Sequence, residues 1–142
     1  MINKELICDY PCTDIHRNSI VPQPAIDTSL IKTVIISEAP PYDHSNYFYR
    51  DISGSFFQTT MTAFWDAGIQ IKSYDDLTDM GIYLTTAIKC SKTDYLVSSK
   101  TIKACSGLLE KELAQFPEIK VIMCMGDFAI KAVNYIYKDK YG

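Results

Sequence analysis

Short apolar runs alternate along the chain with segments whose apolar residues recur at helical spacing. Three runs rich in β-branched residues, at 30–37, 81–88 and 118–125, are typical of strands buried on both faces. A helical stripe between the first two runs ends at Gly68, and a second stripe between the last two ends before Pro117. This order predicts an α/β fold with three layers, α/β/α, around a central parallel sheet.

A third helix is predicted after the last apolar run. Asp127 is suited to begin it, and the apolar residues on its expected inner face are Ala129, Ala132, Val133 and Ile136. No linker, repeat or low-complexity segment interrupts the pattern. We therefore expect residues 1–142 to form a single domain, and the apolar share of 47% is enough for its core.

The sequence also favours a cellular compartment. No run approaches the roughly 18 apolar residues that a membrane span needs, and the first twelve residues lack the apolar centre of a signal peptide. A cytoplasmic protein that does not bind membranes is the expectation. In that reducing compartment, the five cysteines are better suited to metal ligation or to burial as thiols than to disulfides.

Four of the cysteines form two pairs that lie far apart in the sequence. Cys8 and Cys12 precede the first predicted strand, whereas Cys90 and Cys105 follow the second; Cys124 belongs to an apolar run and is expected in the core. The two pairs meet only if the fold carries the N-terminal arm onto the body. Four thiolates suit an iron–sulfur cluster or a zinc ion, and unliganded thiols are the third alternative.

Polar residues follow each predicted strand, where parallel sheets bind their ligands. The first strand leads into 37–44 and an aromatic loop at 46–50, the second into 89–92, and the third into Gly126 and Asp127. Carboxylates, a histidine and a cysteine therefore gather at one edge of the sheet. We expect the functional site there.

The charge of the chain argues against nucleic-acid binding by bulk electrostatics, because the net charge is −3. Local charge differs, since four lysines between 89 and 103 face a single acid, Asp94. These lysines, which either contact phosphates or form a solvated basic segment, are Lys89, Lys92, Lys100 and Lys103.

Several segments, in collinear order, resemble the iron–sulfur uracil-DNA glycosylases usually called family 4. VIISEAPPYD resembles the family's first strand and its motif GEAPG, and CDYPCTDIHRNSIVP resembles the cysteine pair upstream. IYLTTAIKC resembles the second strand with the third cluster cysteine, and IKACSGLLEKEL the helix with the fourth. KVIMCMGDFAIKA resembles the strand, glycine and helix that follow. The resemblance covers nearly the whole chain.

The resemblance implies a monomeric DNA repair enzyme that hydrolyses the N-glycosidic bond of uracil, or of a related deaminated base, in DNA. It also implies a [4Fe-4S] cluster with the four paired cysteines as ligands. The reaction passes through a cationic sugar, which a carboxylate stabilises while it orients the attacking water. Glu38 matches the glutamate of the motif and is the first candidate. Asp43 and His44 lie where the family places further acids, and they are candidates for activating the water.

The resemblance further implies which residues contact the extruded base. Thr86 stands where the family has its base-reading asparagine, although a hydroxyl cannot supply the paired hydrogen bonds of an amide. Ile52 stands where the family has a stacking phenylalanine, a role that Phe48 or Phe56 can also fill. The residues expected around the base are Ala39, Pro40, Tyr42, Ile52 and Thr86.

Members of this family continue past the position of Gly142 to a fourth strand and a histidine motif, HPS. We therefore expect the fourth strand to lie beyond the C-terminus, or to have been lost. The second alternative predicts a nucleic-acid- or nucleobase-binding module of the same fold with impaired catalysis.

Overall fold

The computed structural model describes residue 8, residues 10–50 and residues 52–141. Three strands, β1 (Thr33–Ser37), β2 (Ile82–Thr86) and β3 (Val121–Cys124), form a parallel sheet in the order β2-β1-β3. The predicted parallel sheet is confirmed, with strands shorter than the apolar runs. Ser37 pairs with Thr86, and Ile36 pairs with Cys124, so all three strands deliver their following segments to the same edge.

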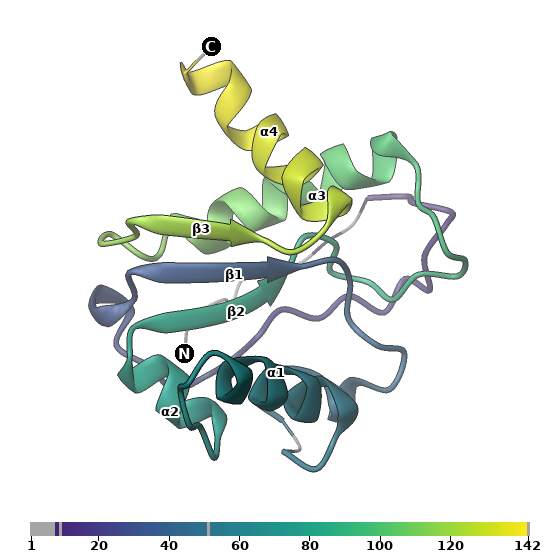
Figure 1. The fold of residues 1–142 in the computed structure, drawn as a ribbon. Helices are drawn as coiled ribbons and strands as arrows, with labels where there is room; N and C mark the ends of the chain where they lie inside the picture. Colours follow the sequence, from purple (N-terminus) through teal and green to yellow (C-terminus); the bar gives the residue numbers. More distant parts are fainter. Residues whose placement is uncertain (1–7, 9, 51, 142) are drawn as a thin grey trace.

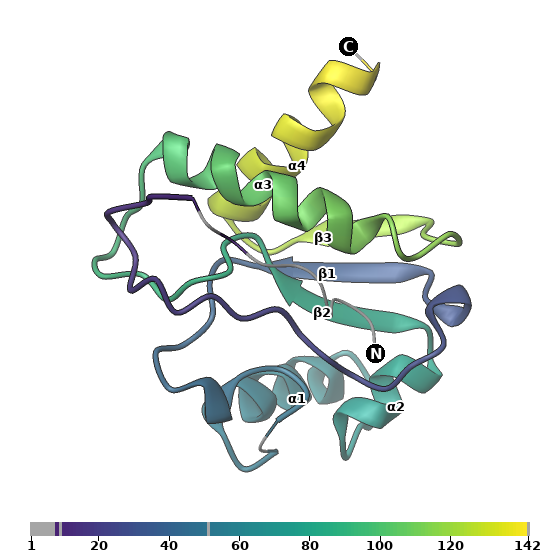
Figure 2. The same cartoon turned by 180° about the vertical axis from the view of Figure 1, so that it is seen from behind.

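Helices cover both faces of the sheet, which confirms the three layers. α1 (Ser55–Asp66) and α2 (Tyr74–Asp79) lie on one face, and α3 (Ser99–Leu113) and α4 (Asp127–Tyr141) lie on the other (Figures 1 and 2). Two short 3-10 helices, η1 (Thr28–Leu30) and η2 (His44–Asn46), stand before and after β1. Among the described helices, none has the length and apolar character to cross a membrane.

The two faces of the sheet are packed to different extents. On the α3 and α4 side, Ala129, Ala132 and Ile136 of α4 are buried as predicted, and Val133 is half-buried. On the other side, Phe57 is the one buried residue of α1. The remaining members of its predicted stripe are half-buried or exposed, and a hollow lined by residues of all three strands lies beside α1.

The helix α2 was not predicted from the apolar pattern. It has only six residues, but its beginning carries a recognisable signal, because Asp76 follows Ser73 by three positions. The Asp76 carboxylate accepts hydrogen bonds from the backbone N–H groups of Lys72, at 2.7 Å, and Ser73, at 3.3 Å. As predicted, Gly68 ends α1, and its φ of +86° is a conformation that favours glycine.

The N-terminal arm is hydrogen-bonded to the segment that follows β2. The N–H of Ile20 donates to the carbonyl of Lys89 at 2.7 Å, and the N–H of His16 donates to that of Ser91 at 2.9 Å. Asn18 adds a side-chain bond, because its Oδ1 accepts from the N–H of Ser91 at 3.0 Å. The arm therefore reaches the loop that carries Cys90.

The same arm also holds the start of α3, the helix that carries Cys105. The Asp14 carboxylate accepts hydrogen bonds from the N–H of Ser98 at 2.7 Å and from the hydroxyl of Thr101 at 2.6 Å. These bonds stabilise the charged carboxylate, and they hold its pKa below the usual value despite some burial. The predicted attachment of the arm to the body is confirmed among the described residues.

Candidate functional site

Four cysteines from three segments line one cavity of about 150 Å³. Cys12, Cys90 and Cys105 are buried, and Cys8 is half-buried. The structure thus brings together the two pairs that the sequence separates. Among the residues that the structure describes, no three side chains of the types His, Cys, Asp and Glu are arranged to hold a metal ion.

The chemistry of these thiols fits a positively charged group. Burial, together with the neighbouring thiols of Cys105 and Cys8, raises the pKa of Cys90 to about 11. Burial also raises the pKa of Cys105, although the backbone of Lys89 partly opposes this effect. The thiols of Cys90 and Cys105 are therefore protonated at neutral pH when no metal is bound. Four thiolates can coexist in this cavity only with a cationic partner, which is the condition that a metal cluster satisfies.

Glu38 directly follows β1, and its carboxylate lies over Gly126, which comes just after β3. A Cβ at position 126 would stand 2.9 Å from Glu38 Oε1, closer than such contacts occur. Gly126 also has a φ of +115°, which side chains rarely allow. A glycine at position 126 therefore leaves room for the Glu38 carboxylate. The sequence placed both residues at the same edge but did not reveal this contact.

The Glu38 carboxylate is paired with Lys92, whose Nζ lies 3.2 Å from Oε2. Lys92 Nζ also donates to the carbonyl of Tyr95 at 3.2 Å. It stands 5.1 Å from the ring centroid of Phe128 and 5.6 Å from that of Tyr95. The side chain of Lys92 is 23% exposed and that of Glu38 is 42% exposed, so the pair remains accessible to solvent. Lys92 was predicted to contact phosphates, but in this structure it contacts the candidate catalytic carboxylate.

The prediction that Lys89 contacts phosphates is wrong, because its side chain is fully buried. Lys89 Nζ lies 2.5 Å from Glu112 Oε1, and it donates to Thr85 Oγ1 at 2.9 Å and to the carbonyl of Thr86. Glu112 is also fully buried, and it accepts hydrogen bonds from Tyr83 and Thr85. This network joins α3 to β2 inside the protein. Sequence patterning missed it because lysine is usually exposed.

The other two predicted phosphate contacts, Lys100 and Lys103, are exposed on α3. Lys103 Nζ stands 6.0 Å from the ring of Tyr135 on α4. Their exposure permits contact with DNA, and this role stays a prediction.

Thr86, the predicted base-reading residue, is fully buried. Its hydroxyl donates to the carbonyl of Ile88 at 2.8 Å and lies 2.7 Å from the hydroxyl of Tyr47, which must then be the donor. A threonine hydroxyl has a single proton, so Thr86 has none left for a base. In this structure it supports Tyr47 and the backbone beyond β2. Ile52, in contrast, is 47% exposed.

Asp43 and His44 lie at the beginning of η2. Hydrogen bonds from the hydroxyl and N–H of Ser45 lower the pKa of Asp43, which caps this short helix. Burial and the nearby charge of Arg50 lower the pKa of His44, so its imidazole is neutral at pH 7. Among the described residues, His44 Nε2 is a buried polar atom without a hydrogen-bond partner. The neutral imidazole therefore has one nitrogen without a hydrogen-bond partner.

The remaining predicted base contacts occupy varied positions. Pro40 is buried, and Ala39 is half-buried against the core. Tyr42 is 72% exposed, and its ring lies edge-on to that of His16, with the centroids 4.8 Å apart. Tyr42 therefore lies next to the N-terminal arm.

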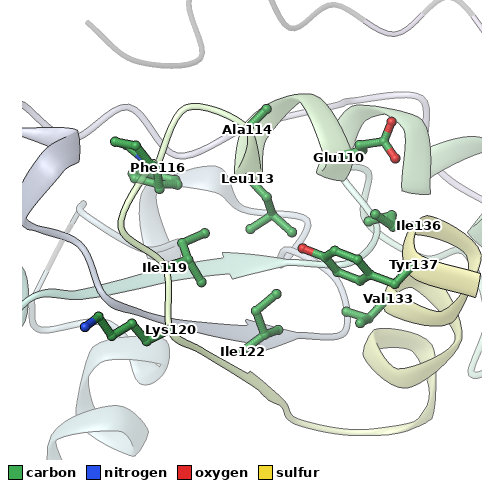
Figure 3. A pocket seen from close by; sticks show the side chains of 11 residues that line it. Glu110, Leu113, Ala114, Phe116, Ile119, Lys120, Ile122, Val133, Ile136 and Tyr137 are labelled. Atoms are coloured by element: carbon green, nitrogen blue, oxygen red, sulfur yellow. The ribbon is translucent and has the colours of Figure 1, made fainter. Parts of the chain in front are cut away.

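An apolar hollow of about 400 Å³ runs along the open face of the sheet beside α1. Ser37 and Met125 line it at the edge where Glu38 and Gly126 follow, and Phe48 forms part of its wall. A different cavity, of about 480 Å³, lies between α3, α4 and the start of β3 (Figure 3). Ile119 and Lys120 line that second cavity, at the opposite edge of the sheet from Glu38. The hollow beside α1 is therefore the one that adjoins the candidate site.

Comparison with known proteins identifies a family for the chain. The family model for the uracil DNA glycosylase superfamily matches residues 25–141. The chain is also 28% identical over 120 residues to the type-5 uracil-DNA glycosylase of Thermus thermophilus, an alignment that covers 79% of this chain and 53% of that protein. It thus spans about half the length of this curated relative. The predicted superfamily is confirmed: the chain belongs to the uracil DNA glycosylase superfamily.

Proposed function

We propose that this chain forms part of a DNA repair glycosylase that hydrolyses the N-glycosidic bond of uracil or a related deaminated base in DNA. The observation that carries the proposal is the position of Glu38. Its carboxylate is held over Gly126 at the carboxyl edge of the sheet, in a chain of the uracil DNA glycosylase superfamily. This is the edge at which parallel sheets bind their ligands.

The surrounding residues support a role for Glu38 at the reacting sugar. The sugar becomes cationic as the bond to the base breaks, and a nearby carboxylate stabilises that charge and orients the attacking water. His44 is neutral and has a free Nε2, so it can accept the proton of this water. Asp43 holds η2, and therefore His44, in place.

The hollow beside α1 offers room for the extruded base. An enzyme of this class must move the base out of the double helix and hold it in a pocket. Phe48 is buried in the wall of the hollow, and we propose that it provides the aromatic surface for the base. Ile52 is exposed and Thr86 has no proton to donate, so both are weaker candidates for this contact.

We further propose that the four-cysteine cavity holds a [4Fe-4S] cluster, with zinc as the alternative. A cluster bound there would hold the N-terminal arm, through Cys8 and Cys12, against the segments that carry Cys90 and Cys105. We expect broad visible absorbance from the purified protein, lost in the Cys90→Ser variant and kept in Cys124→Ser, because Cys124 does not line the cavity. Bound zinc without visible absorbance would contradict the cluster.

The proposed activity is tested with oligonucleotides that carry uracil, hypoxanthine or xanthine, in single- and double-stranded form. We expect the wild-type chain to release at least one of these bases and Glu38→Gln to release none. The matched control is Glu118→Gln, an exposed carboxylate before β3, which should keep wild-type activity. Failure of the wild-type chain to release any base, or full activity in Glu38→Gln, would contradict the proposal.

A module that binds DNA or a nucleobase without catalysis is the second candidate. It is favoured by the engaged hydroxyl of Thr86, which has no proton left for a base. Tight binding of a uracil-containing oligonucleotide without release of the base would support it.

A monomeric state and a cytoplasmic location stay predictions.

A further inference from the structure

Cleavage of an N-glycosidic bond separates two opposite charges. The bond between C1′ and the base nitrogen breaks with both electrons going to the base, which leaves a cationic sugar and an anionic base. Water then adds to C1′ and gives up one proton to His44, which restores a neutral sugar. A site that stabilises only the sugar leaves the charge of the base uncompensated, so a donor for the departing base is also needed.

We propose that Lys92 is a catalytic residue that stabilises the departing base as its negative charge develops. This inference rests on the proposed function and names a second participant in the same reaction. Lys92 Nζ and Glu38 Oε2 are opposite charges 3.2 Å apart at the edge where the reaction is proposed. Their arrangement complements the two charges that form when the glycosidic bond breaks.

The surroundings of Lys92 hold its ammonium group in place. The Glu38 carboxylate and the carbonyl of Tyr95 accept two of its hydrogen bonds, each 3.2 Å long. The rings of Phe128 and Tyr95 lie within 6 Å, where an aromatic ring attracts a cation. An ammonium group has three donors, so two are engaged and the third is left for a carbonyl oxygen of the base.

No other described cation has this position. Lys89 is three residues away in the sequence, but it is fully buried and paired with Glu112. His44 is neutral at pH 7 and is assigned to the water. Among the described residues, Lys92 is therefore the cation with an ion pair to the candidate catalytic carboxylate.

The test compares two leaving groups. Single-turnover release of uracil and of 5-fluorouracil is measured from otherwise identical oligonucleotides, because fluorine stabilises the departing anion and reduces the need for a cation. We expect Lys92→Met to slow uracil release by about 10²- to 10³-fold, the usual cost of removing one such donor. The loss for 5-fluorouracil should be at least tenfold smaller. Lys92→Arg, which keeps the charge, should retain part of the activity.

The matched control is Lys111→Met, which makes the same chemical change at an exposed position on α3 and should leave both rates unchanged. An equal loss for both bases in Lys92→Met would overturn the role of Lys92 and leave the glycosylase proposal intact, because it would show a defect in positioning. Absence of base release from the wild-type chain would overturn both proposals.

Discussion

Two lysines that lie three positions apart in the sequence form ion pairs of opposite character. Lys89 and Glu112 are both fully buried, and every oxygen of that carboxylate has a hydrogen-bond partner. Lys92 and Glu38 are partly exposed at the edge of the sheet. The first pair joins α3 to β2, whereas the second faces the region where a ligand is expected.

The comparison shows how burial separates structural from chemical roles. A buried ion pair loses its interactions with water, so removing one partner leaves an uncompensated charge and strongly destabilises the protein. A partly exposed pair contributes little to stability, because water solvates each charge when the other is absent. The Lys92–Glu38 pair can therefore be rearranged by a substrate at small energetic cost, and the Lys89–Glu112 pair cannot.

The largest effect is expected from Lys89→Met, which leaves the Glu112 carboxylate buried without its cation. We expect the free energy of unfolding to fall by about 3–5 kcal/mol. Urea denaturation measures this change. The double variant Lys89→Met/Glu112→Gln removes the charge but keeps an acceptor for Tyr83, so it should be more stable than Lys89→Met alone. A loss below 1 kcal/mol in Lys89→Met would remove the distinction between the pairs.

A smaller effect on stability, and a larger one on activity, is expected from Gly126→Ala. The new Cβ would collide with the Glu38 carboxylate, and the backbone at φ +115° would be strained, at a cost of roughly 1–3 kcal/mol. The matched control is Gly68→Ala, which has a φ of +86° but open space around it. Both variants should lose stability, and only Gly126→Ala should lose base release as measured in single turnover. Equal rates of base release in the two variants would contradict the proposed position of the Glu38 carboxylate over Gly126.

A modest dependence on pH is expected from His44. Its pKa in the folded chain is lowered, so the unfolded chain takes up the proton first as the pH decreases. The contribution of neutral His44 to stability is therefore complete above the unfolded pKa of about 6.5, and it is lost as the pH falls through the lower pKa of the folded chain. Urea denaturation at several pH values should show a shallower acid dependence for His44→Gln than for the wild type. If the wild type and His44→Gln lose stability equally as the pH decreases, the proposed effect of burial on the pKa of His44 is contradicted.

The smallest effect on stability is expected from Lys92→Met. Its ion pair is partly exposed, so its loss should change the free energy of unfolding by less than about 1 kcal/mol. Urea denaturation alongside Lys89→Met checks this directly. Comparable losses in the two variants would mean that both pairs are structural.

The main features of the fold followed from the sequence because they depend on local patterns. The apolar runs and stripes predict strands and helices by their spacing alone, and the order of these elements predicts a parallel sheet. Helix α2 was missed because six residues are too few to show a periodic pattern. The four cysteines, which the sequence offered as one set of ligands, line one cavity.

The contacts of the candidate site were less predictable because they join distant segments. Glu112 lies 23 positions after Lys89, and nothing near either residue shows that they are buried together. Glu38 meets Lys92 across 54 positions, and the role of Gly126 depends on a clash that only the fold reveals. Thr86 was assigned to the base through its likeness to a family position, whereas its hydroxyl bonds Tyr47 and Ile88.

The most direct test of the central claim is the single-turnover rate of uracil release by Glu38→Gln, measured beside the wild type after urea denaturation has shown that both are folded. The account predicts that Glu38→Gln keeps its stability and releases uracil at least 10²-fold more slowly than the wild type, because the Lys92–Glu38 pair takes part in the reaction. A folded Glu38→Gln variant that releases uracil at the wild-type rate would contradict the account.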